Sequence, residues 1–544
     1  MTNANNKKQR PLHSVASDYF EYLGTHLPQQ CASDDFYFLP RSEVATQHLS
    51  SLDDLNPEKI QDHIRYVQNL FRDIPAHGRE DLDEETDRFL LKQSMESFVR
   101  QFDDAQVWRN DPTLYVKIPL FATDHVISRR DSSPDESKSD LCLVLGQIPS
   151  FLGVASRTLY CPSELALEVA VSMVQDAIGF YKHDLRSFFV QQFGSDKELL
   201  SKNEEALQAL QQYKKELCEL PSTPSFAVGG DGLQEISAVS LRYHRSPEEI
   251  LEIAQHMYQK TQGKLRELAR RIDPRKTWGR LIREQAPSAT SSEGLMRLYQ
   301  REVEHLRRFF YSQRVVTIPP EEKVIVLKTP SYLRSLRATA SYRAPLSGGT
   351  NSHGLFYITP GKEDLEVISK HCPYLCAHET YPGHHILDHL RINQSNPIRR
   401  QIESPLFYEG WSCYAEQLLD ELGYIEDPRV QLIGLKRQLW RNLRAILDVE
   451  LQTERITLAQ GAEKIERIGF SAKRAQSQIR RFALTPGYQL CYSMGMYEIL
   501  RLRKRFSSQL ALKIFHDMLL GGGQLPFHLV EKRLEANAAG REKE

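Results

Sequence analysis

The stretch from His378 to His385 limits what this chain can fold into more than any other. It reads His-Glu-Thr-Tyr-Pro-Gly-His-His, so the histidines that could bind one metal ion are separated by a Pro-Gly pair. On an unbroken helix the later histidine would lie either about 120° around the axis or about 10 Å along it, too far to share an ion. Proline and glycine interrupt helices. The sequence therefore predicts a helix broken at Pro382.

Two registers of this interruption remain open. If Pro382 and Gly383 form a bulge, His384 takes the place of the second metal ligand; if three residues are extruded, His385 does. We favour His384 as the ligand and assign His385 to substrate binding. Glu379 is the expected general base, because the glutamate beside the first histidine carries the proton in zinc hydrolases with a His-Glu-x-x-His helix.

A third ligand is expected from the segment that begins Glu-Gly-Trp at position 409. This segment reads as a helix with Glu409 in its first turn and Glu416 seven residues later on the same face. Two histidines and a carboxylate leave one position open on a tetrahedral zinc ion, as catalysis requires. The predicted cofactor is therefore Zn²⁺, bound by His378, His384 and Glu409. We expect Glu416 to orient a ligand or a substrate amine.

Both segments resemble the signature of the bacterial domain-of-unknown-function 885 family, which is grouped with the gluzincin metallopeptidases. The resemblance rests on His-Glu-x-x-Pro-Gly-His-His and Glu-Gly-Trp-x-x-Tyr-Ala-Glu, with further fitting stretches at Thr485–Gly495 and Phe515–Pro526. The second segment is also similar to the one that supplies the zinc-binding glutamate in aminopeptidase N-like enzymes, which corresponds to Glu409. The likeness is densest from about Ser341 to Leu534. The chain departs from the family pattern at residues 486–489, which affects substrate preference more than metal binding.

The resemblance implies a zinc-dependent hydrolase that cleaves peptide bonds of small peptides. From its place in the family motif, Tyr492 is the candidate for stabilising the oxyanion, with Tyr488 behind it. Arg343 and Arg481 are candidates for holding a substrate carboxylate. Two alternatives stay open: a metal-dependent enzyme acting on a non-peptide amide or specialised metabolite, and a non-catalytic binding protein on the same scaffold. The presence of Glu379 disfavours the second alternative.

Apolar residues recur at three- and four-residue spacing along most of the chain, which predicts a mainly α protein. We expect a large multi-helix metallopeptidase-like fold with a small β-sheet beside the metal-binding helix. The expected strands are residues 323–327 and 353–358, and Gly354–Ile358 is predicted to be the edge that pairs with an extended substrate. We divide the chain into an N-terminal helical region, residues 1–320, and a catalytic metal-binding region, residues 321–544, in one continuous architecture.

Two polar stretches are expected to form loops. Residues 132–139 contain a Ser-Pro pair and predict a flexible surface loop. Ser347–Thr350 is expected to form a loop near the mouth of the sheet.

Charge and composition indicate which partners the protein can bind and in which cellular compartment it is expected. The 70 Lys and Arg against 71 Asp and Glu give a net charge of −1, so neither nucleic acid nor an anionic membrane is an expected partner. No window approaches about 18 uninterrupted apolar residues, and the polar first ten residues resemble neither a signal peptide nor an anchor. Eight scattered cysteines indicate reduced thiols. We therefore expect a cytoplasmic protein that acts on a small peptide or amide substrate.

Overall fold

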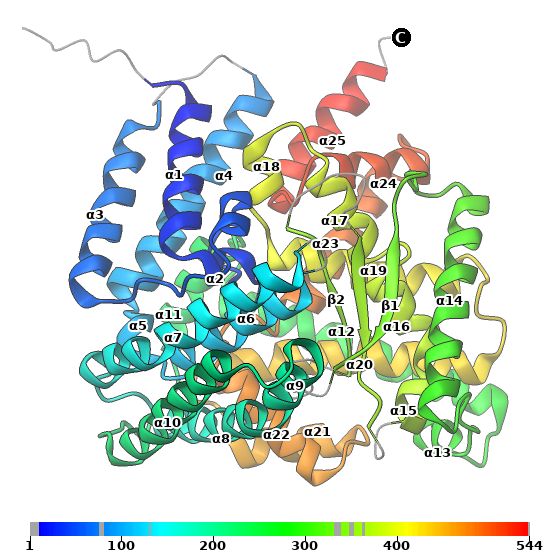
Figure 1. The fold of residues 1–544 in the computed structure, drawn as a ribbon. Coiled ribbons are helices and arrows are strands. Elements are labelled where there is room, and N and C mark those ends of the chain that lie inside the picture. Colours follow the sequence, from blue (N-terminus) through cyan, green and yellow to red (C-terminus); the bar gives the residue numbers. More distant parts are fainter. Residues whose placement is uncertain are drawn as a thin grey trace, which may run out of the picture. The chain divides into compact units, whose positions relative to one another are not determined.

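The computed structural model describes residues 10–75, 81–129, 132–330, 339–346, 353–361 and 365–541. The chain forms two compact units. Unit 1 comprises the residues as far as Phe226 together with Ser395–Glu403, and unit 2 comprises Ala227–Gln394 and the residues from Ser404 onward. Helices dominate, and one small sheet accompanies them, which confirms the predicted fold class (Figure 1).

Unit 1 is built from helices that bury their apolar faces against one another, as the three- and four-residue spacing predicts. Its helices are α1 (Leu12–His26), α2 (Pro28–Ala32), α3 (Pro57–Asp73), α4 (Leu82–Val99), α5 (Val107–Asn110), α6 (Leu114–Ser128), α7 (Pro134–Thr158), α8 (Glu164–Gly179), α9 (Arg186–Phe193), α10 (Lys197–Glu219) and α18 (Pro397–Gln401). Shorter helical turns lie at Asp34–Phe36, Glu43–Gln47, Arg100–Asp104 and Phe180–Leu185.

The start of α7 corrects the surface loop expected at residues 132–139. Ser133 caps the helix by accepting a hydrogen bond from the N–H of Glu136, whose carboxylate in turn accepts from the N–H of Ser133. Pro134 occupies the first helical position, where its missing N–H costs nothing. By length and composition alone, α7 is the one helix in the described part of the chain that could cross a membrane. Buried core helices meet the same criterion, and 44 % of its most apolar window is buried.

Unit 2 also consists mainly of helices, and the predicted change of region between residues 320 and 321 falls inside it. Within this unit α12 packs on α20, α19 packs on α23, and α16 lies against both α14 and α19. The helices are α11 (Gly229–Glu235), α12 (Pro247–Ile272), α13 (Trp278–Arg283), α14 (Ser292–Gln313), α15 (Leu365–Lys370), α16 (Cys372–Glu379), α17 (His384–Ile392), α19 (Pro405–Glu421), α20 (Pro428–Gln452), α21 (Leu458–Arg467), α22 (Ala472–Ala483), α23 (Cys491–Phe506), α24 (Leu512–Gly521) and α25 (Phe527–Arg541), with a further turn at Ile236–Ser240.

The sheet of unit 2 has the order β1-β3-β2 and lies beside α16 (Figure 1). Strand β3 (Gly354–Ile358) pairs in parallel with β1 (Val324–Lys328) and antiparallel with β2 (Ala340–Arg343). The prediction that Gly354–Ile358 is an edge is therefore wrong, because the short strand β2, which has no β-branched residue, covers it. All five residues of β3 are buried, as suits a central strand. The loop expected at Ser347–Thr350 lies outside the described residues.

The segment that joins α17 to α19 belongs to unit 1. Arg399 Nε donates to Asp87 Oδ1 at 2.7 Å, and both side chains are buried. Arg400 Nε donates to Glu43 Oε1 at 2.6 Å, and the backbone N–H of Arg41 donates to the carbonyl of Gln401 at 2.7 Å. Two helices of unit 2 are thus connected through a segment that is anchored in unit 1.

Candidate metal centre

The predicted interruption lies between α16, which ends at Glu379, and α17, which begins at His384. The N–H of Gly383 donates to the carbonyl of Ala377 at 3.0 Å, which folds the chain back over the end of α16. A Cβ atom at position 383 would overlap the carbonyl oxygen of His378, so only glycine fits this approach. The interruption turns the imidazoles of His378 and His384 toward each other, with ring centres 4.7 Å apart.

A close approach of α19 and α23 holds the second segment against this interruption. The two helices cross at Gly410 and Gly495, and a Cβ atom on Gly495 would overlap the carbonyl oxygen of Leu406. Trp411, one residue after Gly410, donates from Nε1 to the carbonyl of Pro382 at 2.7 Å. The Glu-Gly-Trp sequence therefore combines a ligand candidate, a helix crossing and an anchor for the broken segment.

Three buried side chains meet here. Glu409 Oε2 lies 3.4 Å from His378 Nε2 and 3.7 Å from His384 Nε2, and all three atoms lie within 4.8 Å of one another. Ligand atoms about 2.1 Å from a tetrahedral zinc ion are separated by about 3.4 Å. In the described part of the chain, Glu409 Oε2 is buried without a hydrogen-bond partner. The three residues therefore fit a zinc ion, and the register that supplies the second histidine is that of His384.

Glu416 lies behind His378, where it was expected to orient a ligand. Its Oε1 is 2.9 Å from His378 Nδ1, and its carboxylate accepts hydrogen bonds from Arg437 and Arg441. Arg441 Nη2 also lies 3.3 Å from the same ring nitrogen, but the shorter contact with the carboxylate favours a proton on Nδ1. This tautomer leaves the Nε2 lone pair directed at Glu409.

His384 is held by its own set of partners. Its Nδ1 lies 2.9 Å from Ser412 Oγ, and its ring stacks on Tyr408 with centres 3.8 Å apart. Tyr408 in turn donates to Asp388 Oδ2 at 3.0 Å. Burial, together with the charge of His378, lowers the pKa of His384 to about 3. The imidazole is therefore neutral at physiological pH, which is the form that binds a metal.

The electrostatics of the three candidates favour a cation between them. Burial opposes the charge of Glu409, but the close approach of His378 and His384 lowers its pKa to about 2. Burial also opposes a charge on His378, yet its contacts with Cys413, Glu409 and Glu416 raise its pKa well above the ordinary value. Glu409 and Glu416 thus stabilise a positive charge beside His378, whether a proton or a metal ion carries it.

Glu379 lies next to His378 at the end of α16 and is held by a backbone contact. Its Oε2 accepts a hydrogen bond of 2.9 Å from the backbone N–H of Tyr342 in β2. Burial raises the pKa of Glu379 to about 7, and the charge of Glu409 acts in the same direction. A general base is most effective when its pKa lies near the working pH. The proton affinity of this carboxylate is the one that a general base would need.

His385 lies outside the ligand set, and its role in substrate binding stays a prediction. Consecutive helical residues point about 100° apart, so His385 cannot share the direction of His384. Its Nε2 lies 2.7 Å from Glu322 Oε2, and its Nδ1 lies 3.3 Å from the hydroxyl of Tyr342. Tyr381 donates to the same oxygen of Glu322 at 2.5 Å. His385 therefore ties β2 to a buried network.

The two predicted tyrosines lie at the start of α23 and in the turn before it. Tyr488 donates to Glu409 Oε1 at 3.0 Å, so it orients the ligand carboxylate. Tyr492 packs edge-on against Tyr488 with ring centres 5.9 Å apart. Burial, followed by the charge of Glu409, raises the pKa of the Tyr492 phenol. Its hydroxyl therefore stays protonated and able to donate a hydrogen bond.

The structure places the two predicted arginines in different surroundings. Arg343 lies half-buried in β2, beside the strand residue that contacts Glu379, whereas Arg481 is exposed in α22.

Asp448 has a role near the site that the sequence did not indicate. It accepts hydrogen bonds from the backbone N–H groups of Gly487, Gln489 and Leu490 and so fixes the turn before α23. No local signal predicts this, because Asp448 lies four residues after an arginine and looks like half of a helical ion pair.

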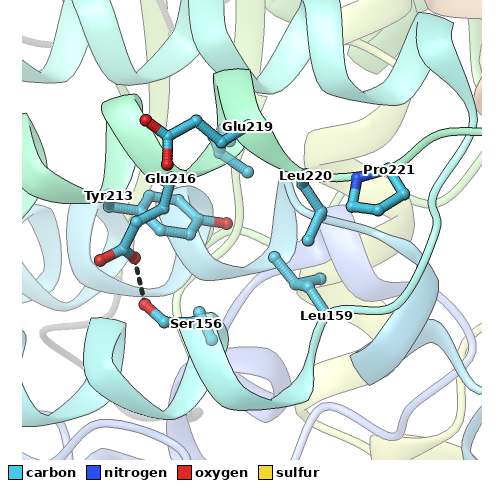
Figure 2. Close-up of a pocket in the computed structure, with 9 residues that line it drawn as sticks. Ser156, Leu159, Tyr213, Glu216, Glu219, Leu220 and Pro221 are labelled. Carbon is cyan, nitrogen blue, oxygen red and sulfur yellow. Dashed lines mark hydrogen bonds between the residues drawn. The ribbon is translucent and has the colours of Figure 1, made fainter.

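Two surface hollows lie away from the metal centre. One, of about 360 Å³, lies between α7 and α10, where Ser156 donates a hydrogen bond to Glu216 beside Tyr213 (Figure 2). The other, of about 470 Å³, adjoins the first turns of α14 and is lined by Arg297 and Arg301. Neither is lined by a candidate metal ligand.

Comparison with known proteins identifies one family, and the similar solved structures include two that cover nearly the whole chain. The family described as "Bacterial protein of unknown function (DUF885)" matches residues 43–534. No curated protein matches the chain. A structure described as "the putative lipoprotein from Colwellia psychrerythraea" is 19 % identical with a TM-score of 0.82, covering 97 % of this chain and 99 % of its own. A "putative lipoprotein of unknown function from Shewanella oneidensis" is 16 % identical with a TM-score of 0.76, covering 96 % and 99 %. These likenesses show the fold.

Proposed function

The chain belongs to the DUF885 family of bacterial proteins of unknown function, and we propose that it is a zinc-dependent hydrolase that cleaves peptide bonds of small peptides. One observation carries the proposal: in the described part of the chain, Glu409 Oε2 is buried without a hydrogen bond and lies 3.4 Å and 3.7 Å from the Nε2 atoms of His378 and His384. Two imidazoles and one carboxylate are the ligand set of a hydrolytic zinc site with an open position.

The residues around the ligands divide the remaining chemistry. Bound zinc would polarise the scissile carbonyl and lower the pKa of a water molecule to about 7. Glu379 accepts the proton of that water and returns it to the amine nitrogen as the C–N bond breaks. The N–H of Tyr342 holds Oε2 of this carboxylate, so the proton is carried by Oε1. Tyr492 supplies a hydroxyl to the oxyanion, in keeping with its place beside Glu409.

Strand β2 is the part of the sheet that can align a peptide. In the described part of the chain β2 pairs only with β3 and so forms an edge. N–H groups alternate between the two sides of a strand, and that of Tyr342 points away from β3 to Glu379. An extended peptide paired with this edge would run beside the general base. This moves the expected substrate edge from Gly354–Ile358 to Ala340–Arg343.

Metal analysis and peptide hydrolysis test the proposal together. We expect one zinc ion per wild-type chain. His378→Ala should weaken zinc binding by more than the roughly 10- to 100-fold that changing a partner of a ligand costs. Glu379→Gln should keep zinc and lose about 10²- to 10⁴-fold in the rate of hydrolysis. The exposed Arg467→Gln in α21 is the matched control and should change neither measurement.

Two outcomes would contradict the proposal. Full zinc binding by His378→Ala would refute the ligand assignment. Zinc-loaded wild type that hydrolyses no member of a panel of dipeptides and oligopeptides would refute the peptidase activity, and turnover of non-peptide amides by the same preparation would identify the alternative substrate class.

A further inference from the structure

Helix α20 presents a row of basic side chains to the metal centre. Arg437, Arg441 and Arg444 lie on one face of the helix at spacings of four and three residues. Arg437 and Arg441 both pair with the carboxylate of Glu416. Arg444 forms no ion pair in the described part of the chain. Asp448, one turn later, uses its carboxylate on backbone N–H groups instead.

Arg444 is nevertheless held in one orientation. Its guanidinium carbon lies 3.7 Å from the ring centre of Tyr492, which is the distance of a stacked cation. Its Nε and Nη2 donate to Gln489 Oε1 at 2.9 Å and 2.5 Å. The backbone N–H of Gln489 is fixed in turn by Asp448. The guanidinium also interacts with the Tyr492 hydroxyl, and no carboxylate among the described residues forms an ion pair with it, so a preorganised cation lacks a counter-ion.

Two tyrosines connect the guanidinium of Arg444 to the candidate metal ligand Glu409. Tyr488 donates to Glu409, and Tyr492 packs against Tyr488 and carries Arg444 on its face. The guanidinium therefore lies on the tyrosine side of Glu409. Tyr492, which we assign to the oxyanion, lies between the cation and the metal ligand. A substrate group that reaches Arg444 must belong to a residue close to the scissile bond.

Two acidic residues near the metal centre, unlike Arg444, are already paired within the protein. Glu416 is neutralised by two arginines, and Asp388 accepts from Arg391 and Tyr408. Both groups are therefore engaged within the protein and do not offer a free carboxylate to a substrate ammonium group. The charge that lacks a counter-ion is positive, which suits a substrate carboxylate and not a substrate amine.

We propose that Arg444 binds the α-carboxylate of the substrate's C-terminal residue, so that the enzyme removes residues from the C-terminal end of peptides. This inference rests on the proposed function and names its substrate class. The reaction is hydrolysis: the oxygen of water joins the scissile carbonyl carbon, the C–N bond breaks, and the released amine takes the proton from Glu379. Arg444 takes the role that the sequence assigned to Arg343 or Arg481.

The test compares acetyl-Ala-Ala-Ala with a free carboxylate, the same peptide as its C-terminal amide, and an amidated peptide ending in glutamate. Wild type should cleave the free acid at least 10-fold more efficiently than either amide. Arg444→Gln should lose roughly 10- to 100-fold in kcat/KM on the free acid, mainly through KM, and should lose clearly less on the alanine amide. Arg444→Lys should recover part of the loss, and Arg467→Gln should behave as wild type.

Binding gives a readout that does not need turnover. Titration calorimetry of the three peptides against zinc-loaded Glu379→Gln should show preference for the free acid, and adding Arg444→Gln should abolish that preference. Zinc content and Tm establish that each variant is folded. If wild type cleaves no peptide but this preference is present and depends on Arg444, the proposed function fails while the carboxylate site stands.

Three results would overturn the assignment. Equal binding and cleavage of acid and amide by wild type would show that no carboxylate is read. An equal loss on both substrates in Arg444→Gln would show that Arg444 only supports Tyr492. A preference for the glutamate amide equal to that for the free acid would place a side-chain carboxylate, and not the C-terminus, at this site.

Discussion

At the scale of the residue, Glu416 determines which nitrogen of His378 is available to an ion. Two arginines neutralise its charge, so a buried carboxylate can lie 2.9 Å from the ring without being protonated itself. Burial opposes its charge, but Arg437 and Arg441 keep the pKa of Glu416 well below the ordinary value. The histidine would then bind an ion through Nε2, and its orientation depends on Glu416, which lies on the other side of the ring.

A second buried carboxylate, Asp53 in unit 1, gives a prediction for the pH dependence of stability. It accepts hydrogen bonds from the N–H groups of Gln29 and Gln30, and burial raises its pKa from 3.8 to about 7. Between these two values the unfolded chain has lost this proton and the folded chain has kept it. The free energy of unfolding should therefore fall as pH rises across that window, by about 1.4 kcal/mol per pH unit from this group.

Asp53→Asn should remove this contribution. Urea unfolding at pH 4.5 to 7.5 is the measurement, and the variant should gain stability relative to wild type as pH rises. The exposed Asp231→Asn serves as control. A difference between wild type and Asp53→Asn that stays constant over the window would contradict the prediction.

At the scale of the element, the site depends on how closely α19 approaches α23. A side chain at Gly495 would overlap the carbonyl of Leu406, so Gly495→Ala should force the helices apart. We expect a loss of about 1–3 kcal/mol in the free energy of unfolding, together with weaker zinc binding because Glu409 moves. Gly263→Ala, in the exposed middle of α12 with open space around it, should leave zinc binding unchanged. Equal zinc affinity in Gly495→Ala and wild type would refute the argument.

The elements also show how far the sequence predicts the site. The helix break follows from a local feature, since Pro-Gly ends a helix, but the sequence left two registers open and only the packing brings His384, and not His385, to Glu409. Strand β2 and the inward face of α20 could not be predicted in this way. A four-residue stretch in which only Tyr342 favours a strand becomes one through pairing with β3, and which arginines of α20 meet Glu416 depends on long-range packing.

At the scale of the whole molecule, the connection between α17 and α19 is anchored outside the unit that holds the metal ligands. Arg399 and Asp87 form a buried ion pair in unit 1, and removing one partner of such a pair costs about 3–5 kcal/mol. Arg399→Ala should therefore destabilise unit 1 by this amount. It should also weaken zinc binding, because His384 and Glu409 lie on the two helices that this segment joins.

Denaturant unfolding and zinc titration of the same preparation measure both effects. Arg129→Ala removes a half-exposed ion pair with Asp140 in unit 1 and is the control. If Arg399→Ala loses stability while zinc affinity stays at the wild-type value, the anchor acts on unit 1 alone.

The segment between α17 and α19 also determines which fragments of this protein can keep the metal centre intact. A fragment that starts at Ala227 would contain His378, His384 and Glu409, yet its segment from Ser395 to Glu403 would have lost the unit 1 partners that hold it. Shortened versions made for expression, or shuffled with relatives, should therefore keep unit 1 if the helices that carry the histidines and the glutamate are to stay in place.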